Sequence, residues 1–127
     1  MTALWLMPTD VPEDPVSGSL IRLVLPAGEH ITRDIAEAFA DQARTAAAGV
    51  RRPVLLVITG IASLSREARG VLSRSRSASA IAVLGGSAVD RVLANFLLGG
   101  EPPPCPIRYF GDEGAAVQWL SGRTHDR

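Results

Sequence analysis

Five aliphatic residues in a row, from Val54 to Ile58, constrain the fold of this chain more than any other feature. The run does not alternate apolar with polar residues, which is typical of a strand whose two faces are both covered by helices. Burying these side chains contributes on the order of 7 to 15 kcal/mol, an upper bound because the unfolded chain is already partly compact. We therefore predict a central strand here. The loop at its C-terminal end is where open α/β sheets place ligand or partner sites.

The rest of the chain alternates between strand and helix patterns. Apolar runs predict further strands at Leu4–Met7, Leu20–Leu25, Ala80–Leu84 and Ile107–Phe110. Amphipathic patterns with capping residues predict helices from Thr32 to Gly49, Ser65 to Ser79, Ser87 to Gly99 and Asp112 to Gly122. Arg22 indicates that the second strand lies toward a sheet edge or has one face partly open, and Arg108 indicates that the last strand lies at an edge. The order predicts an α/β fold with a mostly parallel sheet of about five strands and about four helices, in which the first strand is the best candidate for an antiparallel one.

The length of 127 residues fits one domain, which we place at residues 1–122, followed by a flexible tail at residues 123–127. Cys105 is the single cysteine, so an intramolecular disulfide is excluded. The first seven residues lack a basic region, and no apolar run approaches the length of a membrane span. We therefore expect a cytoplasmic protein that is not inserted into a membrane.

All thirteen basic residues are arginine, which excludes every mechanism that requires a lysine. Residues 1–41 hold seven acids and two arginines, a net charge of minus five. Residues 51–76 hold six arginines and one glutamate, a net charge of plus five. Such asymmetry suits the steering of a charged partner. Nucleic acid is not the expected partner, because no aromatic residues interleave with the arginines and the overall charge is zero.

Two helices carry candidate contact residues. After the central strand, Arg66, Arg69 and Arg76 are predicted to share one helix face, opposite the apolar positions. That face is either a solvated surface or a docking surface for an acidic partner or an anionic group, since guanidinium groups bind carboxylate and phosphate.

In the next helix, Leu98 is predicted to point roughly opposite Val89. The five apolar residues predicted on the core face are Val89, Val92, Leu93, Phe96 and Leu97. Phe96, Leu97 and Leu98 at the end of this helix are a candidate homodimer or partner interface.

The sequence offers no complete catalytic or cofactor site. Ser63 and Ser65 need a neighbouring base to act as nucleophiles, and we expect none, because His125 is in the tail and His30 lies on a different connection. No residues have metal-ligand spacing, and the glycine motifs of phosphate and dinucleotide sites are missing. The Gly85-Gly86-Ser87 segment is expected to be a turn with a helix cap rather than a phosphate cradle. We expect no cofactor and no enzyme activity.

With this order of elements, the chain resembles the STAS-like (SpoIIAA-like) family, whose type member is the bacterial anti-sigma-factor antagonist, and in particular its STAS/SEC14-like branch. The likeness covers about Leu20 to Leu120. It rests also on three segments: Gly60-Ile-Ala-Ser-Leu-Ser65, Asp90-Arg-Val-Leu-Ala-Asn-Phe-Leu-Leu-Gly99, and Arg108-Tyr-Phe-Gly-Asp-Glu113 through Trp119-Leu120.

The resemblance implies a bacterial regulatory module that acts by protein–protein contact. In the antagonists, a serine or threonine at the start of the helix after the central strand is phosphorylated by a partner kinase, which switches binding off. Here Arg66 occupies that position and Ser65 lies one place early, which argues against a phosphoswitch and favours Ser65 as an N-cap. Ser63 and Ser65 are the candidate phosphosites. The alternative function is small-molecule or lipid binding, in which alanine-rich helices close an apolar pocket against the sheet. An enzyme is the remote alternative.

Overall fold

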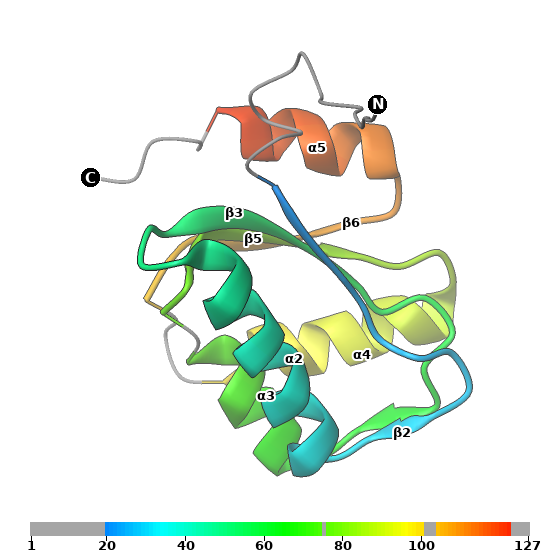
Figure 1. Cartoon of the computed structure of the whole chain (residues 1–127). Coiled ribbons are helices and arrows are strands. Elements are labelled where there is room, and N and C mark those ends of the chain that lie inside the picture. Colours follow the sequence, from blue (N-terminus) through cyan, green and yellow to red (C-terminus); the bar gives the residue numbers. More distant parts are fainter. Residues whose placement is uncertain (1–19, 75, 101–103, 123–127) are drawn as a thin grey trace, which may run out of the picture.

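A computed structural model describes residues 20–74, 76–100 and 104–122 of the chain (Figure 1). The elements in chain order are β1 (Ile21–Val24), β2 (His30–Ile31), α2 (Arg33–Ala47), β3 (Arg52–Val57), β4 (Ser63–Leu64), α3 (Arg66–Ser73), β5 (Ala78–Leu84), α4 (Ala88–Leu98), β6 (Ile107–Phe110) and α5 (Glu113–Ser121). The predicted order of strands and helices is confirmed for these residues. The strand predicted at Leu4–Met7, and with it the antiparallel orientation, lies outside the described residues.

Four parallel strands form the main sheet in the order β1-β3-β5-β6. Each crossover advances by one strand in the same direction, so right-handed connections place α2, α3 and α4 on the same face. Helix α5 follows the last strand and covers the other face (Figure 1). The first described strand, β1, is parallel to its neighbour β3, and β1 and β6 form the edges of the described sheet, as Arg22 and Arg108 predict.

Strand order never reverses among these four strands. Open α/β sheets bind ligands in the crevice that forms where the order reverses. The described sheet has no such reversal, so the topological reason for expecting a ligand site beyond β3 does not apply to it.

The core has two layers because β3 and β5 are covered on both faces. Every residue of β5 is buried, and so are Pro53 to Leu56 in β3. Leu55 points to the smaller layer under α5, which also contains Ala80, Ala82, Leu84, Ala116 and Leu120. Val54 and Leu56 point to the larger layer under α2, α3 and α4. The prediction that the apolar run forms an inner strand is therefore confirmed.

A second, two-stranded sheet that the sequence analysis did not predict pairs β2 with β4. The ladder between β1 and β3 continues through their loops, where the Gly28 N–H donates to the Gly60 carbonyl at 2.8 Å and the Ala62 N–H to the Glu29 carbonyl at 2.8 Å. Gly60 has a φ of +79°, a left-handed conformation that favours glycine. This extension aligns the starts of α2 and α3 side by side.

Helix α3 ends at Ser73, so the predicted end at Ser79 is wrong. Ser77 and Ala78, which follow the helix, instead accept hydrogen bonds from the start of the neighbouring strand β3 and the residue before it. The Arg52 N–H donates to the Ser77 carbonyl at 3.1 Å, and the Arg51 guanidinium donates to the Ala78 carbonyl from Nε at 3.2 Å and from Nη2 at 3.1 Å. Arg76 consequently lies in the turn before β5 rather than on a helix.

The predicted core face of α4 is also wrong in part. Val89 and Val92 are 61% and 65% exposed, whereas Asp90, Ala94 and Leu97 are buried. The Asp90 carboxylate accepts backbone hydrogen bonds from the loops after β3 and β5. These bonds turn the Asp90 side of the helix toward the core, and the two valines then point outward.

Candidate functional site

The two serines predicted as candidate sites lie just before α3, Ser63 in β4 and Ser65 at the N-cap. The Ser65 hydroxyl accepts a hydrogen bond from the Ala68 N–H at 3.0 Å, and the Ser65 backbone is extended. Ser65 is therefore the N-cap of α3, as predicted. Its hydroxyl satisfies one of the free N–H groups of the first helical turn.

Ser63 has a partner that the sequence analysis did not expect. The β2–β4 pairing places His30 opposite Ser63, and the His30 Nδ1 lies 2.7 Å from the Ser63 Oγ. The expectation that no base lies near Ser63 is therefore wrong, because the loop ladder brings the two connections together. A nucleophilic serine also needs its base to be oriented by a third group. Among the described residues, no acidic side chain makes a hydrogen bond to His30.

The guanidinium group of Arg69 is not available to a partner, because it contacts Phe96 of α4. Its guanidinium carbon lies 4.4 Å from the centroid of the Phe96 ring, and its Nη1 donates to the Phe96 carbonyl at 3.4 Å. A Cβ on Gly100 would come within 3.2 Å of the Arg69 Nε. Arg69 thus clamps α3 onto the end of α4.

This clamp also changes the candidate interface on α4. Phe96 is half-buried beneath Arg69, Leu97 is 3% exposed and belongs to the core, and Leu98 is half-buried. Of the three, Leu97 is therefore not a surface residue. The exposed apolar side chains of this helix are instead Val89 and Val92, near its start.

A polar groove lies between α2 and α3, which we call the α2–α3 groove. It has a volume of about 330 Å³ and is lined by Arg33, Glu37, Arg66, Glu67, Gly70, Val71 and Arg74. Cavities of this volume are at the lower end of the range for ligand sites. Sequence periodicity did not reveal the groove, because its two walls come from different helices.

The arginines of the α2–α3 groove differ in their partners. The Arg33 Nε donates to the Glu37 Oε2 at 2.9 Å, and this hydrogen bond and the charge of Glu37 raise the pKa of Arg33. Arg66 and Arg74 are exposed, and neither has an ion-pair partner within the described ranges. The groove therefore presents two guanidinium groups that are available to an anion.

At the start of α4, a carboxylate of the protein itself occupies the place of a bound anion. The buried Asp90 accepts hydrogen bonds from the Gly60 N–H at 3.1 Å, the Gly86 N–H at 2.8 Å and the Ser87 N–H at 3.2 Å. Burial raises the pKa of Asp90, but these hydrogen bonds outweigh it and hold the pKa below its usual range. The Ser87 hydroxyl accepts from the Asp90 N–H in return. The prediction of a turn with a helix cap is confirmed.

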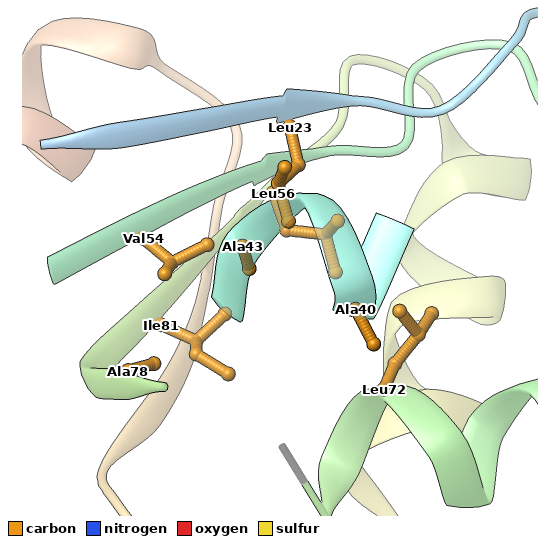
Figure 2. Close-up of a pocket in the computed structure, with 8 residues that line it drawn as sticks. All are labelled: Leu23, Ala40, Ala43, Val54, Leu56, Leu72, Ala78 and Ile81. Atoms are coloured by element: carbon orange, nitrogen blue, oxygen red, sulfur yellow. The ribbon is translucent and has the colours of Figure 1, made fainter. Parts of the chain in front are cut away.

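An apolar cavity of about 20 Å³ lies between α2, α3 and the sheet (Figure 2). Its lining consists of Leu23, Ala40, Ala43, Val54, Leu56, Leu72, Ala78 and Ile81. The location is the one predicted for a pocket under an alanine-rich helix. The volume is enough for about one water molecule and is far below that of a small-molecule site.

Residues 20–74, 76–100 and 104–122 contain no group of three His, Cys, Asp or Glu side chains placed to hold a metal ion. None of their helices is long and apolar enough to cross a membrane.

Comparison with known proteins gives a family and a fold. The family model described as a domain of unknown function, DUF7793, matches residues 17–123. Among curated proteins, none matches the chain.

A crystal structure of an uncharacterized protein of the DUF3478 family with a SpoIIAA-like fold, from Shewanella loihica PV-4, is similar to the chain with 24% identity. The match covers 76% of this chain and 82% of that one, with a TM-score of 0.50. At this identity the likeness concerns the fold alone, and it confirms the predicted α/β fold of SpoIIAA-like type.

A protein with unknown function from Arthrobacter sp. fb24 is 42% identical over 81% of this chain and 92% of that one. Its TM-score of 0.33 is too low to support a structural argument.

Proposed function

The chain belongs to the DUF7793 family, and from that premise we propose that it is a non-catalytic, STAS-like regulatory module that acts by protein–protein contact. The contact surface in this proposal is the start of α3, with Ser63 and Ser65, together with the α2–α3 groove. The observation that carries the proposal is the pair of exposed guanidinium groups of Arg66 and Arg74, which lie in a groove and lack an ion-pair partner among the described residues. Arginine is suited to binding carboxylate and phosphate groups of a partner.

The serines fit a contact role better than a phosphoswitch. The Ser65 hydroxyl is already used as the N-cap of α3. Arg66 stands where the STAS-like antagonists have their phosphorylated residue. We therefore propose that partner binding does not depend on phosphorylation of Ser65.

A pair of charge reversals tests this function. Arg66→Glu changes the charge of the α2–α3 groove, while Arg76→Glu makes the same change at an exposed arginine in the turn before β5. Arg69 is left intact because it contacts Phe96. We expect the wild type and Arg76→Glu to capture the same protein from a lysate of the native host, and Arg66→Glu to lose it. Equal capture by all three proteins would contradict the proposal.

Small-molecule or lipid binding is the alternative, and the apolar cavity beneath α2 is the observation that bears on it. A volume of about 20 Å³ requires α2 to move before a ligand can enter. Native mass spectrometry of protein purified from its host distinguishes the two functions. A co-purified small molecule favours the alternative, and the same spectrum reports whether the protein is a homodimer.

An enzyme is the remote alternative, and the contact between His30 and Ser63 is the one observation in its favour. Its test is covalent labelling of native protein with a fluorophosphonate, which reacts with activated serines. Labelling that is specific to Ser63 and requires His30 would favour a hydrolase.

A further inference from the structure

We propose that Arg66 and Gly70 of α3, together with Arg74 at its C-cap, form a seat for the carboxylate of a glutamate or aspartate side chain in the partner protein. The inference rests on the proposed function, because it names the chemistry that the α2–α3 groove recognises. Three observations support it: the steric role of Gly70, the two available guanidinium groups, and the balance of charge along the groove.

Gly70 lies in the middle of α3, where glycine is among the least favourable residues. Its φ is not in the left-handed region, so conformational freedom does not explain its presence. A Cβ at this position would lie 2.7 Å from the Arg74 Nη1 and 3.0 Å from the Arg74 Nη2. The missing side chain therefore makes room for the Arg74 guanidinium, which lies against the helix backbone one turn before its own Cα.

This arrangement places the Arg74 guanidinium beside Gly70, about one helical turn nearer to Arg66 than the Arg74 Cα. Arg66 is four residues before Gly70, which corresponds to about 6 Å along the helix axis. Both side chains are exposed and line the α2–α3 groove. A carboxylate placed between them accepts charge-assisted hydrogen bonds, which are stronger than neutral ones.

The rest of the lining favours one carboxylate over a highly charged ligand. The groove has three arginines and two glutamates, and Glu37 already neutralises Arg33. With Glu67 the lining has a net charge of plus one, which balances the charge of one carboxylate and leaves the further negative charges of a nucleic acid backbone or a phosphorylated segment uncompensated. Half-buried Val71 supplies an apolar wall for the methylene groups of a glutamate or aspartate.

NMR titration of the labelled protein tests the seat directly. The probes are the capped pentapeptide Ala-Ala-Glu-Ala-Ala, the same peptide with glutamine at its centre, and inorganic phosphate. We expect the glutamate peptide to shift the Nε–H signals of Arg66 and Arg74, and the glutamine peptide to bind at least about tenfold more weakly, the change expected for 1.4 kcal/mol. Equal binding of the two peptides overturns the proposal. Stronger binding of phosphate than of the glutamate peptide also overturns it, in favour of a phosphorylated partner.

Gly70→Ala separates binding from folding. Alanine is the better helix former, and the Cβ meets only the flexible end of Arg74, so we expect the melting temperature to rise by about 2 to 6 °C. The same Cβ displaces the Arg74 guanidinium, so we expect affinity for the glutamate peptide to fall by about tenfold, as in Arg74→Gln. Arg76→Gln, which removes an exposed arginine outside the groove, is the matched control and should bind like the wild type. A Gly70→Ala protein that binds normally contradicts the role of Gly70.

The outcomes also separate this inference from the proposed function. If Arg66→Glu loses its partner in the lysate but the wild type binds both peptides equally, the contact surface stands and the carboxylate seat is wrong. If the glutamate peptide binds at Arg66 and Arg74 but partner capture is unchanged in Arg66→Glu, the seat stands and the proposed function is wrong.

Discussion

Replacement of Asp90 by alanine is expected to destabilise the fold more than any surface change. The variant removes the acceptor for the N–H groups of Gly60, Gly86 and Ser87, and it also removes half of the capping box at the start of α4. A buried donor left without a partner costs about 1 to 3 kcal/mol. The three costs are not additive, because the carboxylate no longer has to be desolvated and the loops relax. We therefore expect a loss of about 3 to 5 kcal/mol in the free energy of unfolding.

Urea denaturation followed by circular dichroism at neutral pH measures this loss. Because it approaches the total stability of a typical domain, Asp90→Asn serves as the second variant. Asparagine keeps one oxygen acceptor but turns an NH₂ group toward a backbone N–H, so we expect about 2 kcal/mol. A loss below about 1 kcal/mol in both variants would refute the account of Asp90 as the link between the β3 and β5 loops.

The pH dependence of the same variants has a defined sign. The folded pKa of Asp90 lies below the ordinary value of 3.8, so the ionised carboxylate stabilises the fold above that pH. This contribution is lost as the pH falls through the lowered folded pKa. We expect the difference in stability between the wild type and Asp90→Asn to be constant above about pH 5 and to shrink below pH 3.8. A difference that grows on acidification contradicts the stated direction.

Three further predictions concern the Arg69 contact, the turn at Gly60 and the reactivity of Ser63. Arg69→Ala should lower the free energy of unfolding by about 1 to 2 kcal/mol in urea titrations through loss of its contact with Phe96, whereas Arg66→Ala should change it by less than about 0.5 kcal/mol. Gly60→Ala forces a side chain into a φ of +79° and should cost about 1 to 2 kcal/mol, measured by the same titration; a neutral effect would contradict the assigned turn. Ser63 should not react with a fluorophosphonate faster in the native than in the unfolded protein, and selective native labelling in an intact-mass spectrum would favour the enzyme alternative.

The sheet could be predicted because its signals are local. The uninterrupted run from Val54 to Ile58 requires cover on both faces, and it became an inner strand. The charged side chains of Arg22 and Arg108 need access to solvent, and their strands, β1 and β6, lie at the edges of the described sheet. The N-caps Ser65 and Ser87 each accept the backbone hydrogen bond that their position predicts.

The candidate site could be predicted only in part, because it depends on contacts between distant segments. His30 and Ser63 lie on two-residue strands, which are too short to give a periodic signal. Helix α4 is turned by Asp90, whose partner Gly60 is in a separate loop. Arg76 is not on the predicted arginine face, because α3 ends at Ser73, and Ser77 and Ala78, which follow Arg76, are hydrogen-bonded to Arg52 and Arg51.

The most direct test of the proposed contact function is quantitative affinity capture by the wild type, Arg66→Glu and Arg76→Glu, with cross-links mapped on the captured complex. All three proteins should have the same circular dichroism spectrum, because both arginines are exposed and neither has an ion-pair partner among the described residues. We predict that the wild type and Arg76→Glu recover the same partner, cross-linked to residues of the α2–α3 groove, and that Arg66→Glu does not. Recovery of that partner by Arg66→Glu, or cross-links confined to the α5 face, would contradict the account.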